Sequence, residues 1–437
     1  MGARKTALNV LLACRKEGGW SNGVLKEYTA RDRLDSRDSA LASRLCYGVL
    51  QNRNCLDFYL SQLLTGKLKH LHPAVRDILH LGLYQILFMD KIPESAAVNE
   101  SVELTKKYCR KQQNAPGLVN GILRNAVRNK DSLKEPVSWE DKYSHPGELI
   151  NLLKAYVGKE RMEPMLRANN TVAPVTAQVN TLKITPEALL EKLQMEGVTA
   201  KSHAWLSGCL ELSGTGNLEK LQSFQDGLFY IQDPAARLSV LCADIKPGQK
   251  VLDCCAAPGG KSFAAMICMN GQGSVTSCDV HPHKIQLIAK GAERLGMDNL
   301  TAQLQDATEN CPQWQERFDT VIADVPCSGL GIIRKKPDIR YKEIASFAAL
   351  PALQKEILNN AASYVKKGGL LLYSTCTLLR AENEAMVEDF LFTHPDFCTE
   401  PLPLPAPFPK NESGMLTLVP GEYDTDGFFI CRLRRKV

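Results

Sequence analysis

Two cysteines occur where apolar runs of the chain give way to short polar segments. The first lies in "DVPCSG", residues 324–329, directly after a Val-Ile-Ala run, and the second lies in "YSTCT", residues 373–377. A thiol in such a place can ligate a metal, act as a nucleophile, or fill space as a small apolar side chain. A reactive thiol needs partial exposure and a positive neighbour, and Lys261 is a candidate for that charge.

Metal ligation is the least favoured of these roles. The sequence has no C-x-x-C pair, Cys254 and Cys255 are adjacent, and the histidines at 281 and 283 lack a cysteine at ligand spacing. The 15 cysteines are an odd number. We find neither a signal-peptide pattern nor a run near the ~18 apolar residues of a membrane span. These features predict a cytoplasmic protein with free thiols and no metal.

A glycine-rich loop, "DCCAAPGGKS" at residues 253–262, joins a predicted strand to a predicted helix. Small residues let the backbone approach a ligand there, and a helix N-terminus offers free N–H groups. A phosphate-binding P-loop would need a glycine where Cys255 stands, and Pro258 removes a donor. A nucleoside pocket would need an acidic residue about 20 positions further on. Asp279, which follows Gly260 by 19 positions, meets that requirement.

The elements that must position these residues follow from about residue 247 onward. Predicted strands cover 249–255, 274–280, 300–306, 318–325, 368–376 and 426–434, and predicted helices cover 260–269, 282–296, 346–366 and 381–394. This alternation predicts a mostly parallel, doubly wound sheet, whose ligands bind beyond the carboxyl ends of the strands. Both thiols and three acidic residues, Asp279, Asp306 and Asp324, fall at such ends. The alternative for the acidic residues is ordinary solvated turns.

The N-terminal third predicts helices and no strands. Segments 96–108 and 117–130 are amphipathic, and the second has a basic face. Residues 1–150 carry 23 Lys and Arg against 16 Asp and Glu, although the whole chain has a net charge of only +5. This excess favours a polyanion partner, most simply nucleic acid, over an ordinary solvated surface. After it, strand-like and helix-like segments predict a small α+β module.

The segments "CAAPGGK", "DVPCSG" and "STC", in this order and spacing, resemble the S-adenosylmethionine-dependent RNA cytosine-C5 methyltransferases. "KKPDIR" follows the Pro-Cys loop as it does in that family. "SRLCYGVLQNR", "RDILHLGLYQILF", "AAVNESVEL" and "GLVNGILRNAVR" resemble the NusB-like RNA-binding domain. This pairing is typical of the bacterial 16S rRNA cytosine-C5 methyltransferases of the RsmB (Sun) type.

The resemblance implies three domains. These are an all-α NusB-like RNA-binding domain at 1–135, a linker with a small α+β RNA-binding module at 136–235, and a C-terminal α/β Rossmann-like methyltransferase domain at 236–437. It also implies S-adenosyl-L-methionine (SAM) as the cofactor. The implied partner is 16S rRNA, free or in an early small-subunit assembly intermediate, with cytosine 967 as the target of a monomeric enzyme.

Roles for single residues come from their positions in the family's motifs. The resemblance implies that Cys376 is the nucleophile that adds to cytosine C6, that Cys327 serves product release, and that Asp324 contacts N3 of the base and the cofactor. Asp279 is expected to hold the ribose hydroxyls and Asp306 to lie near the adenine. The rest of the implied cofactor site is Cys255, Ala256, Ala257, Pro258, Gly259, Gly260 and Lys261. The chain departs from the family at Ser262, where Thr is common, and in "TLLRAENE", a segment that often carries proline.

Four basic residues just past the Pro-Cys loop are candidates for gripping RNA phosphates, although a solvated basic loop would look the same. They are Arg334, Lys335, Lys336 and Arg340. Two other functions stay open: methylation of tRNA or another RNA, and RNA binding without catalysis. The presence of both thiols disfavours RNA binding without catalysis. The missing glycine of the P-loop disfavours a nucleoside triphosphatase.

Overall fold

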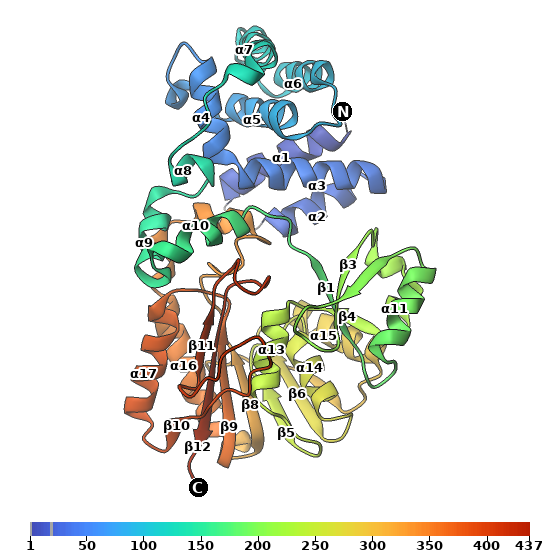
Figure 1. Cartoon of the computed structure of the whole chain (residues 1–437), viewed down its shortest axis with the longest axis vertical. Helices are drawn as coiled ribbons and strands as arrows, with labels where there is room; N and C mark the ends of the chain where they lie inside the picture. Colours follow the sequence, from blue (N-terminus) through green and yellow to red (C-terminus); the bar gives the residue numbers. More distant parts are fainter. Residues whose placement is uncertain (1, 18–20) are drawn as a thin grey trace. The chain divides into compact units, whose positions relative to one another are not determined.

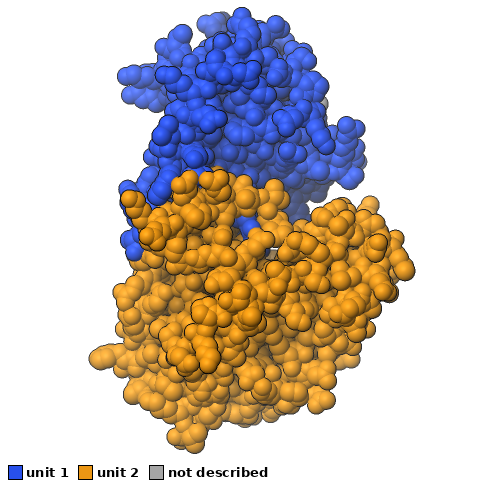
Figure 2. Space-filling view, viewed as in Figure 1, with its two compact units in different colours: residues 1–155, 333–342 blue, residues 156–332, 343–437 orange. Residues whose placement is uncertain are grey.

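The computed structural model describes residues 2–17 and 21–437, and the chain forms two compact units. Unit 1 comprises residues 1–155 and 333–342, and unit 2 comprises residues 156–332 and 343–437 (Figure 2). A ten-residue segment of the chain therefore leaves unit 2 directly after the Pro-Cys loop, contributes to unit 1, and returns.

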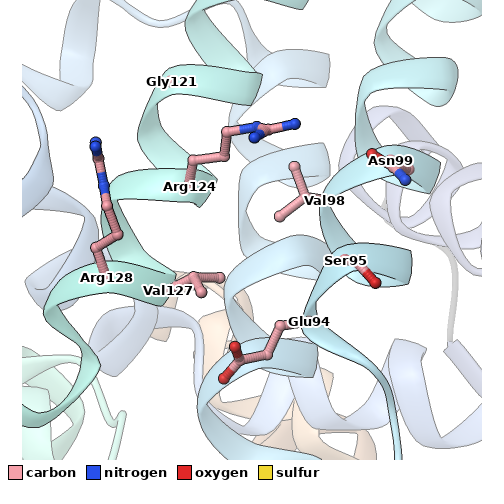
Figure 3. A pocket seen from close by; sticks show the side chains of 8 residues that line it. All are labelled: Glu94, Ser95, Val98, Asn99, Gly121, Arg124, Val127 and Arg128. Carbon is pink, nitrogen blue, oxygen red and sulfur yellow. The ribbon is translucent and has the colours of Figure 1, made fainter.

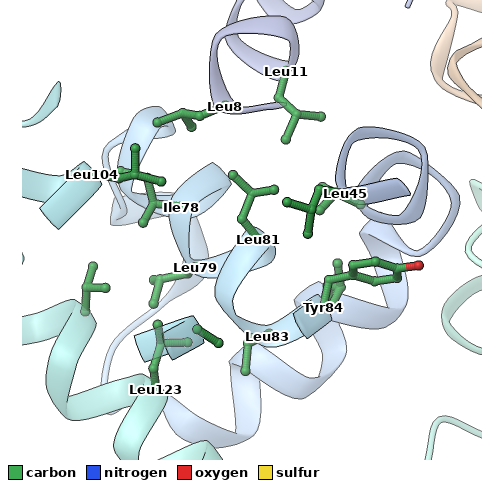
Figure 4. Close-up of a cluster of buried hydrophobic side chains, with 14 of the residues drawn as sticks. Leu8, Leu11, Leu45, Ile78, Leu79, Leu81, Leu83, Tyr84, Leu104 and Leu123 are labelled. Atoms are coloured by element: carbon green, nitrogen blue, oxygen red, sulfur yellow. The ribbon is translucent and has the colours of Figure 1, made fainter. Parts of the chain in front are cut away.

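The regular secondary structure of the described residues of unit 1 is helical, as the sequence predicts for the N-terminal region. Its elements are α1 (Gly2–Glu17), α2 (Ser21–Arg31), α3 (Ser36–Gln51), α4 (Arg53–Leu63), η1 (Leu68–His70), α5 (Pro73–Phe88), α6 (Glu94–Tyr108), α7 (Ala115–Asn129), η2 (Lys130–Ser132), α8 (Trp139–Lys142) and η5 (Pro337–Tyr341), with α9 (Gly147–Val157) at its border. Helix α5 lies at the centre of unit 1, and most of its side chains are buried against apolar side chains of neighbouring helices. Figure 4 shows leucines of α1, α3, α6 and α7 packed around it.

The segment 333–342 is held in unit 1 by buried polar contacts. The Arg340 side chain is only 1% exposed, and its Nη1 donates to the backbone oxygens of Gln51 and Ser144 at 3.0 and 3.1 Å. The Tyr341 hydroxyl donates to the oxygen of Leu50 at 2.9 Å. Because buried carbonyls must be paired, this segment is part of the fold of unit 1 and not a surface loop.

Unit 2 begins with α10 (Lys159–Ala168) and a small antiparallel sheet of order β2-β3-β1-β4, covered by one longer helix (Figure 1). Its elements are β1 (Val175–Val179), α11 (Pro186–Met195), β2 (Thr199–Ser202), β3 (Cys209–Ser213), η3 (Leu218–Lys220), α12 (Gln222–Gln225) and β4 (Phe229–Ile231). This is the small α+β module that the sequence predicts, with β2 as an additional edge strand.

The rest of unit 2 is built on an eight-stranded sheet of order β10-β12-β9-β8-β5-β6-β7, with β11 beside β12. Its elements are α13 (Pro234–Cys242), β5 (Lys250–Asp253), α14 (Gly260–Cys268), β6 (Ser274–Asp279), α15 (Pro282–Leu295), β7 (Leu300–Leu304), η4 (Pro312–Trp314), β8 (Phe318–Asp324), η6 (Ile344–Phe347), α16 (Leu350–Tyr364), β9 (Val365–Thr375), η7 (Arg380–Glu382), α17 (Glu384–Thr393), β10 (Phe397–Thr399), β11 (Met415–Leu418) and β12 (Phe428–Arg435). Strands β5 to β9 are parallel, and the last three strands are antiparallel additions at one edge.

Helices cover both faces of this sheet. Successive strand residues point to opposite faces, so Ile322 packs with α13, α14 and α15, whereas Val321 and Ala323 pack with α16 and α17. Burial on both faces explains why the parallel strands are short, continuous apolar runs. Among the described residues, no helix is both long and apolar enough to cross a membrane.

Candidate active site

The carboxyl ends of the parallel strands bring the predicted site residues to one edge of the sheet. Asp253, Asp279 and Asp324 are the last residues of β5, β6 and β8. In the parallel pair β8–β9, Asp324 is in register with Ser374. Cys327 and Cys376 come a few residues after these two positions, so both lie just beyond the carboxyl ends of their strands. Asp306 comes two residues after the end of β7.

The two thiols meet. The Sγ atoms of Cys327 and Cys376 lie 3.2 Å apart, and the backbone N–H of Cys376 donates to the sulfur of Cys327 at 3.3 Å. Both residues are half-buried. Hydrogen bonding to Cys376, together with burial, raises the pKa of Cys327 well above its ordinary value. The Cys327 thiol is therefore a weaker acid than a free cysteine while it contacts Cys376.

A half-buried ion pair lies beside the thiols. Lys261 Nζ lies 2.7 Å from Asp324 Oδ2, and the Ser374 hydroxyl donates to Asp324 Oδ1 at 2.7 Å. Burial lowers the pKa of Lys261, but attraction to Asp324 outweighs this effect, so the pKa is raised overall. Attraction to Cys376 adds to the same upward shift. The lysine is thus a fixed positive charge near the thiol, as the sequence predicts. A nearby cation favours a thiolate.

A buried network fixes the loops that carry the thiols. Glu382 is 1% exposed, and its Oε2 accepts the backbone N–H of Ser328 at 3.0 Å and the Gln354 amide at 2.8 Å. The same Gln354 nitrogen donates to the oxygen of Pro326 at 2.9 Å. A 2.6 Å hydrogen bond between the Ser328 and Thr377 hydroxyls ties one thiol loop to the other.

Glu382 is a site residue that the sequence did not predict, because its segment has the pattern of the start of a solvated helix. This glutamate and the asparagine beside it follow the second thiol closely, yet nothing in their spacing distinguishes a buried clamp from an exposed first turn. In the structure this segment is the short helix η7, and α17 begins only at Glu384.

Replacing Glu382 by alanine is expected to lower kcat by roughly a hundredfold, the scale for displacing a reacting group by about 1 Å. The Ser328 N–H and the Gln354 amide would lose their common acceptor, so the Pro-Cys loop would shift. Steady-state kinetics with separate kcat and KM test this, alongside Glu388→Ala, an exposed glutamate on α17. Unchanged kcat in a folded Glu382→Ala protein would refute the positioning role.

The glycine loop leaves the start of α14 without a side-chain cap. Gly259 has φ +108°, a conformation that favours glycine. A Cβ at Gly260 would come within 2.9 Å of the Gln232 side chain, so the loop also needs its small residues for packing. No side chain caps the first turn of α14. Its N–H groups are therefore available to a polar ligand group.

Two more predicted carboxylates are held at the same edge. Asp279 Oδ1 accepts the backbone N–H of His281 at 3.1 Å and lies 3.4 Å from Lys284 Nζ. Asp306 Oδ1 accepts from the backbone and the hydroxyl of Thr308, at 2.9 and 2.7 Å. Each uses one oxygen in these contacts, an arrangement that suits carboxylates that must also accept hydrogen bonds from ligand hydroxyl or amino groups.

A third carboxylate, Asp253, is sealed beneath the loop. Its Oδ2 accepts the Ser262 hydroxyl at 2.7 Å, and a further 2.7 Å hydrogen bond joins Ser262 to Ser277. Burial raises the pKa of Asp253 to about 7. Ser262, one of the departures from the family pattern, thus supplies the hydroxyl that a threonine would supply.

This raised pKa predicts a pH-dependent stability. Between the unfolded pKa of about 3.9 and the folded value of about 7, the folded state binds more protons. The free energy of unfolding therefore falls as the pH rises through this range. Compared with Asp253→Asn, the protein without the substitution should lose up to about 1.4 kcal/mol of unfolding free energy for each pH unit in this range. Urea denaturation at several pH values tests this, with exposed Asp298→Asn as the control. Parallel curves for the protein and Asp253→Asn would contradict it.

The four basic residues after the Pro-Cys loop, which we named as candidates for phosphate contacts, differ in burial. All four belong to unit 1. Arg334 and Arg340 are buried, and only Lys335 and Lys336 are half-buried. The Arg340 guanidinium is used by backbone oxygens, which argues against a phosphate contact by this residue. Among the described residues there is also no cluster of three or more potential metal ligands.

Comparison with known proteins agrees with this geometry. Family models match three parts of the chain: "NusB family" residues 1–128, "Methyltr_RsmF/B-like, ferredoxin-like domain" residues 145–219, and "16S rRNA methyltransferase RsmB/F" residues 240–434. The chain is 36% identical over 446 residues to the probable ribosomal RNA small subunit methyltransferase B of Bacillus subtilis (strain 168), covering 99% of this chain and 98% of that protein.

The chain belongs to the 16S rRNA methyltransferase RsmB/F family. The ribosomal RNA small subunit methyltransferase B of Vibrio cholerae is 34% identical over 93% of the chain and 92% of its own length. Among solved structures, PH0851 superposes with a TM-score of 0.81 at 25% identity, covering 99% of this chain and 98% of that one. NSun6 from Pyrococcus horikoshii, solved with SFG, shares the fold at 20% identity, with a TM-score of 0.60 over 66% of this chain and 98% of its own.

Membership of the RsmB/F family confirms the predicted fold class, the NusB-like N-terminal domain and the RNA methyltransferase activity with SAM as cofactor. The cofactor supplies a methyl group on a sulfonium. The uncapped helix start, the small residues of the glycine loop and the strand-end carboxylates fit a nucleoside with a charged amino-acid tail. The roles of single residues remain predictions.

Proposed function

We propose that this RsmB/F-family enzyme methylates C5 of one cytosine in 16S rRNA through a covalent bond between Cys376 Sγ and C6 of the base. The observation that carries this proposal is the pair of thiols, 3.2 Å apart, at the carboxyl edge of the sheet beside Asp324. Relatives that span nearly the whole chain are named as small-subunit rRNA methyltransferases, which supports the substrate class. The RsmB type suggests cytosine 967 as the target.

The base needs activation because cytosine C5 is a poor nucleophile. In the proposed reaction, the Cys376 thiolate adds to C6, and a proton held by the Lys261–Asp324 pair moves toward N3 as electron density reaches C5. C5 then accepts the methyl group. Cys327, after its own proton has passed to solvent, takes the C5 proton as a thiolate. The C5–H electrons restore the C5=C6 bond, the C6–S bond breaks to return Cys376 as a thiolate, and N3 gives its proton back to the Lys261–Asp324 pair.

Other side chains orient the reactants. We assign the cofactor to the loop from Cys255 to Lys261, with the ribose at Asp279 and the adenine near Asp306. The base must leave its stack to reach the thiols. Half-buried Lys335 and Lys336 are the remaining candidates for flanking phosphates, and the substrate is free 16S rRNA or an early assembly intermediate.

The experiment that tests this function is methyl transfer from labelled SAM to unmodified 16S rRNA, with 23S rRNA and tRNA in parallel and the product mapped by mass. A 5-methylcytosine in 16S rRNA alone is the expected result. Label in tRNA alone would overturn the proposed substrate and leave the chemistry intact. Label on a base other than cytosine would overturn the chemistry.

A further inference from the structure

A pocket of about 670 Å³ lies between α6 and α7 of unit 1, in the NusB-like domain. Its volume is in the range of small-ligand sites. The lining residues are Glu94, Ser95, Val98, Asn99, Gly121, Arg124, Val127 and Arg128 (Figure 3). The proposed reaction uses none of them, and the pocket is formed entirely within unit 1.

Two arginines give the pocket its charge. Arg124 and Arg128 are one helical turn apart on α7, so they share a face of the helix, and both are exposed. A 2.9 Å hydrogen bond from Arg124 Nε to Asn120 orients its guanidinium and leaves both terminal nitrogens for a ligand. Figure 3 shows Arg124 reaching from α7 toward Val98 and Asn99 of α6, whereas the Arg128 side chain points away from α6 and has to turn toward the pocket to share a ligand with Arg124. Glu94 lies 3.9 Å from Lys130, which offsets its charge.

The rest of the lining is apolar or neutral. Val98 is buried and Val127 half-buried, so they form an apolar floor, and Ser95 and Asn99 are exposed polar groups at the rim. Gly121 keeps the wall open, since a Cβ there would meet no atom within 4 Å. A ligand that satisfies this lining has an anionic group for the arginines, an apolar face for the valines, and hydrogen-bonding edges. A nucleotide has all three.

We propose that the α6–α7 pocket binds one nucleotide of single-stranded RNA, with its phosphate held by Arg124 and Arg128. Guanidinium groups bind phosphate oxygens through paired, charge-assisted hydrogen bonds. A base or ribose lies on the valine floor, since proteins recognise RNA mainly through unpaired nucleotides with accessible faces. This inference rests on the proposed function, because it takes the RNA substrate as the ligand and adds a contact in unit 1 to the one that unit 2 makes through the thiols.

The first test compares two double variants of the full-length protein that change the charge equally. Arg124→Gln/Arg128→Gln removes the proposed phosphate contact, and Lys106→Gln/Lys107→Gln removes two exposed charges from α6 outside the pocket. The probe is unmodified 16S rRNA in filter binding over a series of salt concentrations. We expect the arginine variant to bind about tenfold more weakly, with the salt slope reduced by about 0.7 per lost phosphate contact. Equal effects of the two variants would overturn the proposal.

The second test fills the pocket without changing the charge. Gly121→Gln places a side chain in the open space, whereas Gly117→Gln lies on the same helix outside the pocket and also meets no atom within 4 Å. Replacing an exposed helical glycine does not destabilise the helix. We expect only Gly121→Gln to weaken RNA binding and to raise KM for RNA while kcat is unchanged. Normal RNA affinity of Gly121→Gln would count against the pocket.

Two further outcomes separate this inference from its alternatives. If the arginine variant loses binding to polyglutamate and keeps RNA binding, the pocket serves an acidic protein partner and the inference is wrong. If the unmodified protein binds 16S rRNA through the pocket but transfers no methyl group to it, the proposed function fails and the pocket stands. Mapping the methyl group therefore tests the proposed function, and measuring RNA affinity tests the pocket independently.

Discussion

Cys376→Ala is expected to lower turnover at least about a thousandfold, the scale on which enzymes respond to loss of a nucleophile. Without the sulfur, C6 of the base has no group to bond, and C5 keeps its low reactivity. Binding of SAM should stay close to normal, since the loop from Cys255 to Lys261, Asp279 and Asp306 lie in other parts of the chain. Methyl transfer to 16S rRNA and calorimetric titration with SAM measure the two properties.

Cys398→Ala is the matched control for this substitution. Cys398 is also a partly exposed thiol, and it lies on β10 of the same sheet, away from the thiol pair. It should leave turnover unchanged. Substantial activity in Cys376→Ala would mean that the nucleophile has been assigned to the wrong thiol.

Cys327→Ala should have a different effect, which is to trap the enzyme on its substrate. Cys376 can still add to C6 and C5 can still accept the methyl group. The C5 proton then has no acceptor, because the Cys327 sulfur, which lies 3.2 Å from the Cys376 sulfur, is missing. We expect multiple turnover to cease and most of the enzyme to migrate with RNA on a denaturing gel when SAM is present. The trapped complex should carry about one labelled methyl group per enzyme, because elimination follows methyl transfer.

The double variant Cys327→Ala/Cys376→Ala provides the control for the trapped complex. It should give no denaturant-resistant band, because the sulfur that bonds to the base is absent. If Cys327→Ala alone turns over normally, or stops without any covalent complex, the proposed role of Cys327 in product release is incorrect.

The architecture of unit 2 was largely predictable from the sequence. The parallel strands are buried on both faces, so they are continuous apolar runs, and their order along the chain fixes which loops meet at the carboxyl edge. This is why the strand pattern alone places Asp324 and both thiols together. The edge strands β10 and β11 were missed. They are only three and four residues long and lie in a proline-rich stretch, where periodicity carries little signal.

Burial of polar residues was the part that the sequence could not indicate. Glu382 and Arg340 resemble surface residues in any linear pattern, and both prove to be almost fully buried with backbone groups as partners. Their roles depend on contacts between segments far apart in the chain. A basic residue in a basic run was therefore assigned to RNA, when its structural partners are the carbonyls of unit 1.

The ten-residue segment that unit 1 receives from the later part of the chain also constrains how the protein is made. A ribosome completes residue 155 long before it reaches Arg340, whose partners are Gln51 and Ser144. At ~5–20 residues per second, the intervening synthesis takes roughly 10–40 s. During that time the helical unit lacks its last piece. It can be completed only after β5 to β8 and the Pro-Cys loop have been synthesised, so completion of the helical unit depends on synthesis of much of unit 2.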